Sequence, residues 1–173
     1  MLNANSINSR IGNYLAGFAD GEGSFMIVIR KRDDYRAKWR ISLCFNVSQK
    51  ESYILSQFKK HLQCGTLRIR PDGVGYFEVN NFNSIWNNIL PFFKKFSFLS
   101  QNKKYQFMLF TKAAKIIHDN EHLSEEGFKE ILEIRNKMNH GGKRINFKLE
   151  SSETICQNPE SAVEFGEDIV RTP

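Results

Sequence analysis

Apolar and polar residues alternate at two different spacings in the first third of the chain. Ile11, Leu15 and Phe18 recur at the spacing of one helical face. Over residues 24–30, and again over residues 38–47, apolar and polar residues alternate one by one, as in half-buried strands. The pattern therefore predicts a helix followed by an antiparallel strand pair with one apolar and one polar face.

A second helix and a second strand pair are expected further along the chain. Residues 54–62 carry an apolar stripe at helical spacing. Ser48 and Glu51 have the spacing of a capping box, in which each side chain binds a backbone amide at the start of a helix. Residues 65–70 and 76–79 repeat the strand pattern on either side of a Pro-Asp-Gly turn, which predicts a hairpin.

Three more helices are expected in the second half. The first begins at Asn83 or Ser84 and is ended or kinked by Pro91. Ser100 and Ser124 precede the other two at the position of an N-cap. The predicted order is αββαββα followed by two helices, an α+β fold around an antiparallel sheet.

Charge divides the chain into two unequal parts. Of its 25 basic and 19 acidic residues, residues 149–173 hold one base and six acids, so residues 1–148 have a net charge of +11. We expect residues 1–148 to form a single domain, since its hydrophobic content suffices for a core, and residues 149–173 to be a flexible acidic tail. A strongly basic domain favours a polyanionic partner such as nucleic acid.

Hydropathy and cysteine spacing indicate an intracellular protein without a membrane partner. No run of about 18 apolar residues is present, and the first ten residues lack the apolar centre of a signal peptide. Cys44, Cys64 and Cys156 are widely separated and lack the spacing of metal ligands. We expect them to be reduced thiols.

Two acids end the first predicted helix. Asp20 and Glu22 are separated by one glycine, and another glycine follows them. The C-terminus of a helix carries partial negative charge, so carboxylates there are stabilised when a cation joins them. Carboxylate oxygens are hard ligands, which favours Mg²⁺ over zinc.

The segment around these acids resembles a known motif. Residues 15–23 read LAGFADGEG, which is similar to the LAGLIDADG motif of homing endonucleases, and residues 121–127 read EHLSEEG, which resembles a segment common in organellar members. The likeness covers residues 11–142. It implies the homing-endonuclease fold with a DNA-binding sheet, and site-specific cleavage of double-stranded DNA that promotes intron mobility.

The chain contains one such motif and no internal duplication. In this family a single motif implies a homodimer in which the first helices pack across a twofold axis. A glutamate at position 22 of each chain would meet at the foot of that axis, and the target would be pseudo-palindromic. The residues expected at the dimer interface are Gly12, Leu15, Ala16 and Ala19.

The resemblance also implies catalytic roles. Glu22 occupies the position of the metal-binding acid and Asp20 that of its structural support. The metal is Mg²⁺ or Mn²⁺, and Ca²⁺ is expected to bind without supporting cleavage. Gln49 stands where the family places a residue that orients water, although an ordinary residue in the first turn of a helix is an equal alternative.

A lysine at the start of the fourth helix often completes the family site by stabilising negative charge. Alignment of the apolar residues that follow favours Lys103 over Lys104. Some single-motif relatives carry this lysine two residues earlier, where this chain has Gln101, so the choice stays open.

The polar face of the two hairpins is the expected DNA surface, because a strand in the major groove presents every second side chain to the bases. Its candidate residues are Ser24, Met26, Arg30, Arg32, Lys38, Arg40, Ser42, Asn46, Thr66, Arg68, Arg70, Tyr76 and Glu78.

Two other functions fit the same scaffold. One is a maturase that binds intron RNA, and the other is a DNA-binding regulator without catalytic activity. Retention of Glu22, Gln49 and a candidate lysine argues against the regulator but not against the maturase. The family likeness favours a mitochondrial or chloroplast location, with the bacterial cytoplasm as the alternative.

Overall fold

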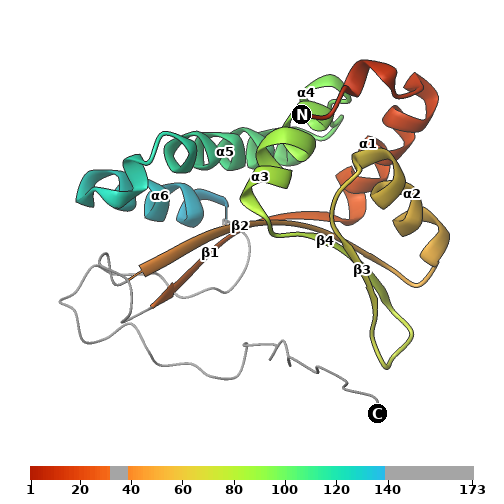
Figure 1. Cartoon of the computed structure of the whole chain (residues 1–173), viewed down its shortest axis with the longest axis horizontal. Helices are drawn as coiled ribbons and strands as arrows, with labels where there is room; N and C mark the ends of the chain where they lie inside the picture. Colours follow the sequence, from red (N-terminus) through yellow and green to blue (C-terminus); the bar gives the residue numbers. More distant parts are fainter. Residues whose placement is uncertain (32–38, 139–173) are drawn as a thin grey trace, which may run out of the picture. The chain divides into compact units, whose positions relative to one another are not determined.

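The structure, a computed structural model, describes residues 1–31 and 39–138. Four antiparallel strands form one sheet in the order β1-β2-β4-β3, and the helices lie on one of its faces (Figure 1). The strands are β1 (Gly23–Lys31), β2 (Trp39–Gln49), β3 (Thr66–Ile69) and β4 (Gly75–Val79). The helices are α1 (Ser9–Glu22), α2 (Ser52–Leu62), α3 (Phe82–Ser84), α4 (Leu90–Lys95), α5 (Gln101–His118) and α6 (Glu125–Met138).

Three short turns complete this list: the 3-10 turns η1 (Ala4–Ser6) and η3 (Glu121–Leu123), and the π-helical turn η2 (Ile85–Ile89). The α+β class, the order αββαββα and the two additional helices are confirmed. No helix in residues 1–31 and 39–138 is long and apolar enough to span a membrane. The predicted acidic tail, 149–173, and Cys156 lie outside the described residues.

Phenylalanines fill the space between the sheet and the helices. The register places Phe25 of β1 opposite Phe45 of β2, and their ring centroids are 5.0 Å apart. Phe25 also contacts Phe93 and Phe98 edge-on, with centroids 5.6 and 5.8 Å away, and Phe110 of α5 at 4.9 Å. The alternation along the strands therefore puts the phenylalanine rings on one face of the sheet and most of the polar side chains on the other.

Strand β2 is longer than its sequence predicts. It continues through Ser48 and Gln49, which pair with Tyr76 and Gly75 of β4, and α2 begins only at Ser52. Glu51 is at the N-cap of α2 and makes no side-chain capping bond. The predicted capping box is therefore wrong, because pairing with a strand from another part of the chain holds this segment extended.

Pro91 does not end its helix. Helical structure continues from α3 through the π-helical turn into α4, with Pro91 in the first turn of α4. A proline inside a helix leaves the carbonyl four residues earlier without its partner. That carbonyl belongs to Asn87, and it accepts a hydrogen bond of 2.7 Å from the backbone amide of Leu2. The N-terminal segment thus satisfies the group that Pro91 frees.

The two serine caps are confirmed. The hydroxyl oxygen of Ser100 accepts from the amide of Lys103 at 3.2 Å, and that of Ser124 accepts from the amide of Gly127 at 3.1 Å. A Cβ at Gly127 would overlap the carbonyl of Glu121. The EHLSEEG segment therefore packs the turn between α5 and α6, where only glycine fits.

Candidate active site

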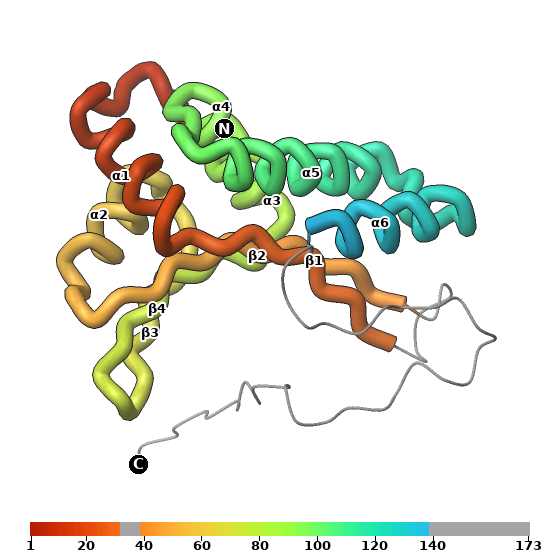
Figure 2. Tube along the Cα trace, turned by 180° about the vertical axis from the view of Figure 1, so that it is seen from behind, coloured from red at the N-terminus to blue at the C-terminus, as the bar shows by residue number. Residues whose placement is uncertain are grey.

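Helix α1 runs directly into strand β1, without a loop (Figure 2). The junction needs a glycine at position 23, because a Cβ there would lie 2.6 Å from the carbonyl oxygen of Ala19. Glu22, the last residue of α1, is exposed to solvent. The junction therefore presents a carboxylate at the end of the sheet where β1 begins.

Asp20 binds the start of α5. Its carboxylate accepts hydrogen bonds from the amides of Leu99 (2.9 Å) and Ser100 (2.8 Å) and from the Ser100 hydroxyl. Burial alone would raise the pKa of Asp20, but the bonds from Ser100 and Leu99 and the charge of Lys103 together lower it. Asp20 is thus an ionised residue whose hydrogen bonds join the end of α1 to the residues that precede α5, and we call this contact the Asp20 clasp.

Lys103 reaches back from α5 to the same junction. Its Nζ donates to the carbonyl oxygen of Gly23 at 2.5 Å, and the side chain is half-buried. Burial lowers the pKa of Lys103, while the charges of Asp20 and Glu22 act against this effect. The structure therefore brings a lysine ammonium together with the two predicted acids.

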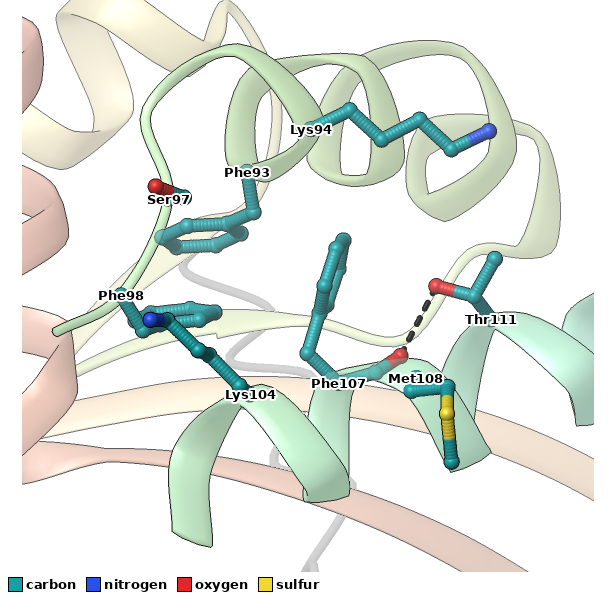
Figure 3. A pocket seen from close by; sticks show the side chains of 8 residues that line it. All are labelled: Phe93, Lys94, Ser97, Phe98, Lys104, Phe107, Met108 and Thr111. Carbon is teal, nitrogen blue, oxygen red and sulfur yellow. Dashed lines mark hydrogen bonds between the residues drawn. The ribbon is translucent and has the colours of Figure 1, made fainter. Parts of the chain in front are cut away.

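Lys104 faces elsewhere. It lines an open hollow of about 250 Å³ between α4 and α5, with Phe93, Phe98 and Phe107, and extends toward Phe98 (Figure 3). Gln101 is the exposed first residue of α5. The geometry favours Lys103 as the lysine of the site.

Gln49 is the last residue of β2. The alternative interpretation of Gln49 as an ordinary residue in the first turn of a helix is therefore excluded. Gly23 pairs with Val47, so Gln49 extends beyond the start of β1 at the same end of the sheet as Glu22. Its Oε1 accepts from the amide of Lys50 at 2.7 Å. The side-chain NH2 group of this uncharged amide remains a donor that can orient a water molecule at this end of the sheet.

The donors at this junction fit a hard divalent cation better than zinc. Within residues 1–31 and 39–138, no three His, Cys, Asp or Glu side chains gather as a closed metal site. A single exposed carboxylate suits Mg²⁺, which keeps several waters and takes further oxygen ligands from a phosphate. Glu22 is the residue that would hold such an ion.

The polar face of the sheet collects most of the predicted DNA-binding residues. The register joins the even-numbered positions of β1 and β2, so Arg30 lies directly opposite Arg40. Like charges in this position repel one another. The described candidates within the strands are Ser24, Met26, Arg30, Arg40, Ser42, Asn46, Thr66, Arg68, Tyr76 and Glu78.

Arg70 lies just past β3 in the hairpin turn, where its guanidinium donates to the hydroxyl of Tyr76 at 2.7 Å and pairs with Asp72 at 3.0 Å. Arg32 and Lys38 lie outside the described residues.

The predicted dimer interface requires a correction. Leu15, Ala16 and Ala19 are at most 1% exposed within the single chain, and Gly12 is buried where a Cβ would overlap the ring of Phe96. These four residues therefore pack against the chain's own core, and their assignment to a dimer interface is wrong. These residues do share one face of α1, as predicted, but that face packs against residues of the same chain, such as Phe96.

Within the residues that the structure describes, the opposite side of α1 lacks such contacts. It carries Tyr14, which is 60% exposed, and two glycines, Gly17 and Gly21, where a Cβ would meet nothing within 4 Å. Leu99, whose backbone amide binds Asp20, lies just before α5, and it is 85% exposed.

Sequence reasoning missed two contacts of the site and its sheet. Ser100 was predicted only as a cap, yet it also binds Asp20. Cys44 lies on the polar face at an even-numbered position, and its Sγ is 3.5 Å from Oε1 of Glu78. The alternation of residues 38–47 already predicts Cys44 on this face, but only the strand order shows its partner.

Comparison with known proteins identifies the family. The sequence model described as LAGLIDADG endonuclease matches residues 15–114. The chain belongs to the LAGLIDADG endonuclease family. Its solved relatives share the fold, a sheet of antiparallel strands with helices.

Among curated relatives, the chain is 32% identical over 130 residues to an uncharacterized cox1 intron-2 protein of Schizosaccharomyces pombe, covering 75% of this chain and 39% of the relative. It spans between about a quarter and two fifths of the curated relatives that it matches first.

Two solved LAGLIDADG structures are informative. The archaeal intron-encoded homing endonuclease I-Vdi141I, complexed with DNA, has a TM-score of 0.71 at 26% identity and covers 80% of this chain and 88% of its own. I-SmaMI, bound to an uncleaved DNA target with calcium ions, has a TM-score of 0.71 at 25% identity and covers 80% of this chain and 47% of its own.

Proposed function

We propose that this chain is a homing endonuclease that hydrolyses both strands of a long, specific DNA target with a divalent metal ion, and so promotes intron mobility. The observation that carries the proposal is the meeting of Glu22, Asp20 and Lys103 at the junction of α1, β1 and α5. The arrangement stands at one end of a sheet whose open face is polar and rich in arginine.

Each residue at the junction has a separate task. Glu22 would hold Mg²⁺ or Mn²⁺, which would neutralise phosphate charge and make a water molecule easier to deprotonate at neutral pH. Lys103, half-buried and close to Glu22, stabilises the negative charge that develops on the phosphate. Asp20 fixes the position of α5 and thereby that of Lys103. Gln49 orients the attacking water.

The open face of the sheet binds the duplex. The repulsion between Arg30 and Arg40, which lie directly opposite each other, is relieved when a polyanion neutralises them. A two-stranded ribbon fits the major groove and presents alternate side chains to the base edges. Tyr76 and Asp72 hold Arg70 at the tip of the second hairpin. From there Arg70 binds a phosphate or a guanine of the duplex.

A homodimer completes the enzyme. The exposed side of α1, with Gly17 and Gly21, permits the close approach of a second α1 helix, and Tyr14 and Leu99 add exposed apolar surface beside it. A twofold axis through this face places one Glu22 from each chain near the other and requires a pseudo-palindromic target. The fungal intron-encoded relatives favour an organellar origin.

Cleavage of a randomised duplex library at moderate salt, with and without Mg²⁺, tests this function. We expect Mg²⁺-dependent double-strand breaks at a long pseudo-palindromic consensus, and a dimer by sedimentation. Salt-sensitive duplex binding without cleavage would contradict the proposed enzymatic activity and indicate a DNA-binding regulator. Binding of intron RNA in preference to duplex DNA would indicate a maturase instead.

A further inference from the structure

One row of polar side chains crosses all four strands on the open face of the sheet. Glu78 of β4 lies opposite Asn46 of β2 on one side and Thr66 of β3 on the other, and Asn46 lies opposite Ser24 of β1. Ser24 directly follows Gly23, so this row is the one nearest the candidate active site along β1. It places an acid on a face whose other charged residues within the strands are Arg30, Arg40 and Arg68.

Cys44 contacts this acid from the neighbouring strand. Its Sγ lies 3.5 Å from Oε1 of Glu78, and the cysteine is only 5% exposed although its position alternates onto the polar face. Burial, with the charge and hydrogen bond of Glu78, raises the pKa of the Cys44 thiol to about 12. The thiol is therefore protonated at neutral pH and donates to the carboxylate, which holds Glu78 in one place.

A fixed carboxylate in the major groove discriminates between bases. It is an acceptor only, so it is repelled by phosphates, by the O6 and N7 of guanine and by the O4 of thymine. It accepts well from the N4 amine of cytosine. Adenine also offers an amine, but its neighbouring N7 acceptor opposes the second carboxylate oxygen.

We propose that Glu78, positioned by Cys44, selects cytosine at one base pair in each half of the DNA target. This inference rests on the proposed function and specifies the substrate of the same surface. Arg30 lies six positions after Ser24 on β1, or about 20 Å at about 3.3 Å per residue. The selected cytosine therefore lies about six base pairs nearer the cleavage site than the bases that face Arg30 and Arg40, at about 3.4 Å per base pair.

Equilibrium selection from a randomised duplex library, without Mg²⁺, tests the proposal with the full chain. The wild type should enrich cytosine at one position of each half-site. Glu78→Gln should shift that position to adenine, the base that a glutamine amide reads, and reduce the preference for cytosine about fivefold to tenfold. An unchanged base profile in Glu78→Gln, with duplex binding intact, would overturn the proposal and leave the proposed function standing.

The role of Cys44 is tested in the same selection. Cys44→Ala should weaken the cytosine preference at that position alone, and Cys44→Ser should restore it, because the hydroxyl replaces the thiol as a donor. Cys64→Ala, which removes the other described thiol, is the matched control and should leave the profile unchanged. A Cys44→Ala profile identical to the wild type would show that Cys44 does not position Glu78. Absence of salt-sensitive duplex binding by the wild type would instead contradict the proposed function itself.

Discussion

The two sides of helix α1 carry similar small residues in opposite surroundings. Gly12 faces Phe96 inside the chain, where no Cβ fits, whereas Gly17 and Gly21 face open space. The first glycine is explained by a neighbour in the same chain, whereas the exposed glycines have no such explanation unless a second α1 helix packs there, as in the proposed homodimer. A helix periodicity shows which residues share a face, but not what covers that face.

The same division continues at the end of the helix. Asp20 is engaged by the backbone and side chain of the loop before α5, while Glu22, two residues on, is exposed. We therefore assign stability to the first acid and metal chemistry to the second. The predictions that follow separate these two kinds of residue.

Exchange of the two acids for their amides should give the largest contrast. Glu22→Gln should reduce the cleavage rate by a thousandfold or more, about 4 kcal/mol of barrier, with an unchanged melting temperature. Asp20→Asn should lower the free energy of unfolding by about 1–2 kcal/mol, because it removes the charge that strengthens these hydrogen bonds and puts an NH2 group where Oδ1 accepts from the Ser100 hydroxyl. Single-turnover cleavage and thermal melting of both variants check the contrast. An equal decrease in melting temperature in the two variants would contradict it.

The second-largest contrast in cleavage rate is expected between the adjacent lysines, Lys103 and Lys104. Lys103→Ala should slow cleavage about 10² to 10³-fold, because it removes the ammonium beside the two acids. Lys104→Ala is the matched control, since that side chain lines the hollow on the α4 side, and its rate should stay within about twofold of wild type. Comparable losses in both variants would disprove the selection of Lys103.

The glycines of α1 test the two faces directly. Gly12→Ala should destabilise the chain by about 1–3 kcal/mol, because the added methyl overlaps the ring of Phe96. Gly17→Ala should not destabilise the monomer and gains up to about 1 kcal/mol of helix propensity. Sedimentation of Gly17→Leu should show loss of the dimer, and a dimer that persists in this variant would place the interface elsewhere.

The pH dependence of Asp20 should be the smallest effect. Its pKa is lower in the folded chain than its ordinary value of 3.8. Its contribution to stability is therefore complete above that value and is lost as the pH falls through the lower folded pKa. Between pH 6 and 3 the wild-type melting temperature should fall about 1–2 °C more than that of Asp20→Asn, and parallel curves would exclude the clasp.

The sequence was informative where the pattern is local and periodic. The alternation of residues 24–30 and the caps at Ser100 and Ser124 predicted strand faces and helix starts correctly, because each depends on neighbours a few residues away. The motif placed Asp20 and Glu22 at the end of a helix, as observed.

Prediction failed where a distant segment decides the outcome. Ser48 and Glu51 have the local pattern of a capping box, but pairing with β4 keeps Ser48 in a strand. Of the two outcomes predicted for Pro91, the end of the helix is excluded, and the carbonyl of Asn87 that Pro91 frees accepts from the amide of Leu2, far away in the sequence. Cys44 likewise owes its contact to Glu78 to the order of the strands. Such partners cannot be read from the spacing of residues alone.

The most direct test of the central claim is calorimetric titration of a divalent ion into the protein bound to its DNA target. Ca²⁺ can be used, so that the duplex stays intact. We predict that Glu22→Gln weakens ion binding at least tenfold while its affinity for the duplex is retained, and that Asp20→Asn binds the ion nearly as well as the wild type. Unchanged ion affinity in Glu22→Gln, or a greater loss in Asp20→Asn, would contradict the division between the two acids.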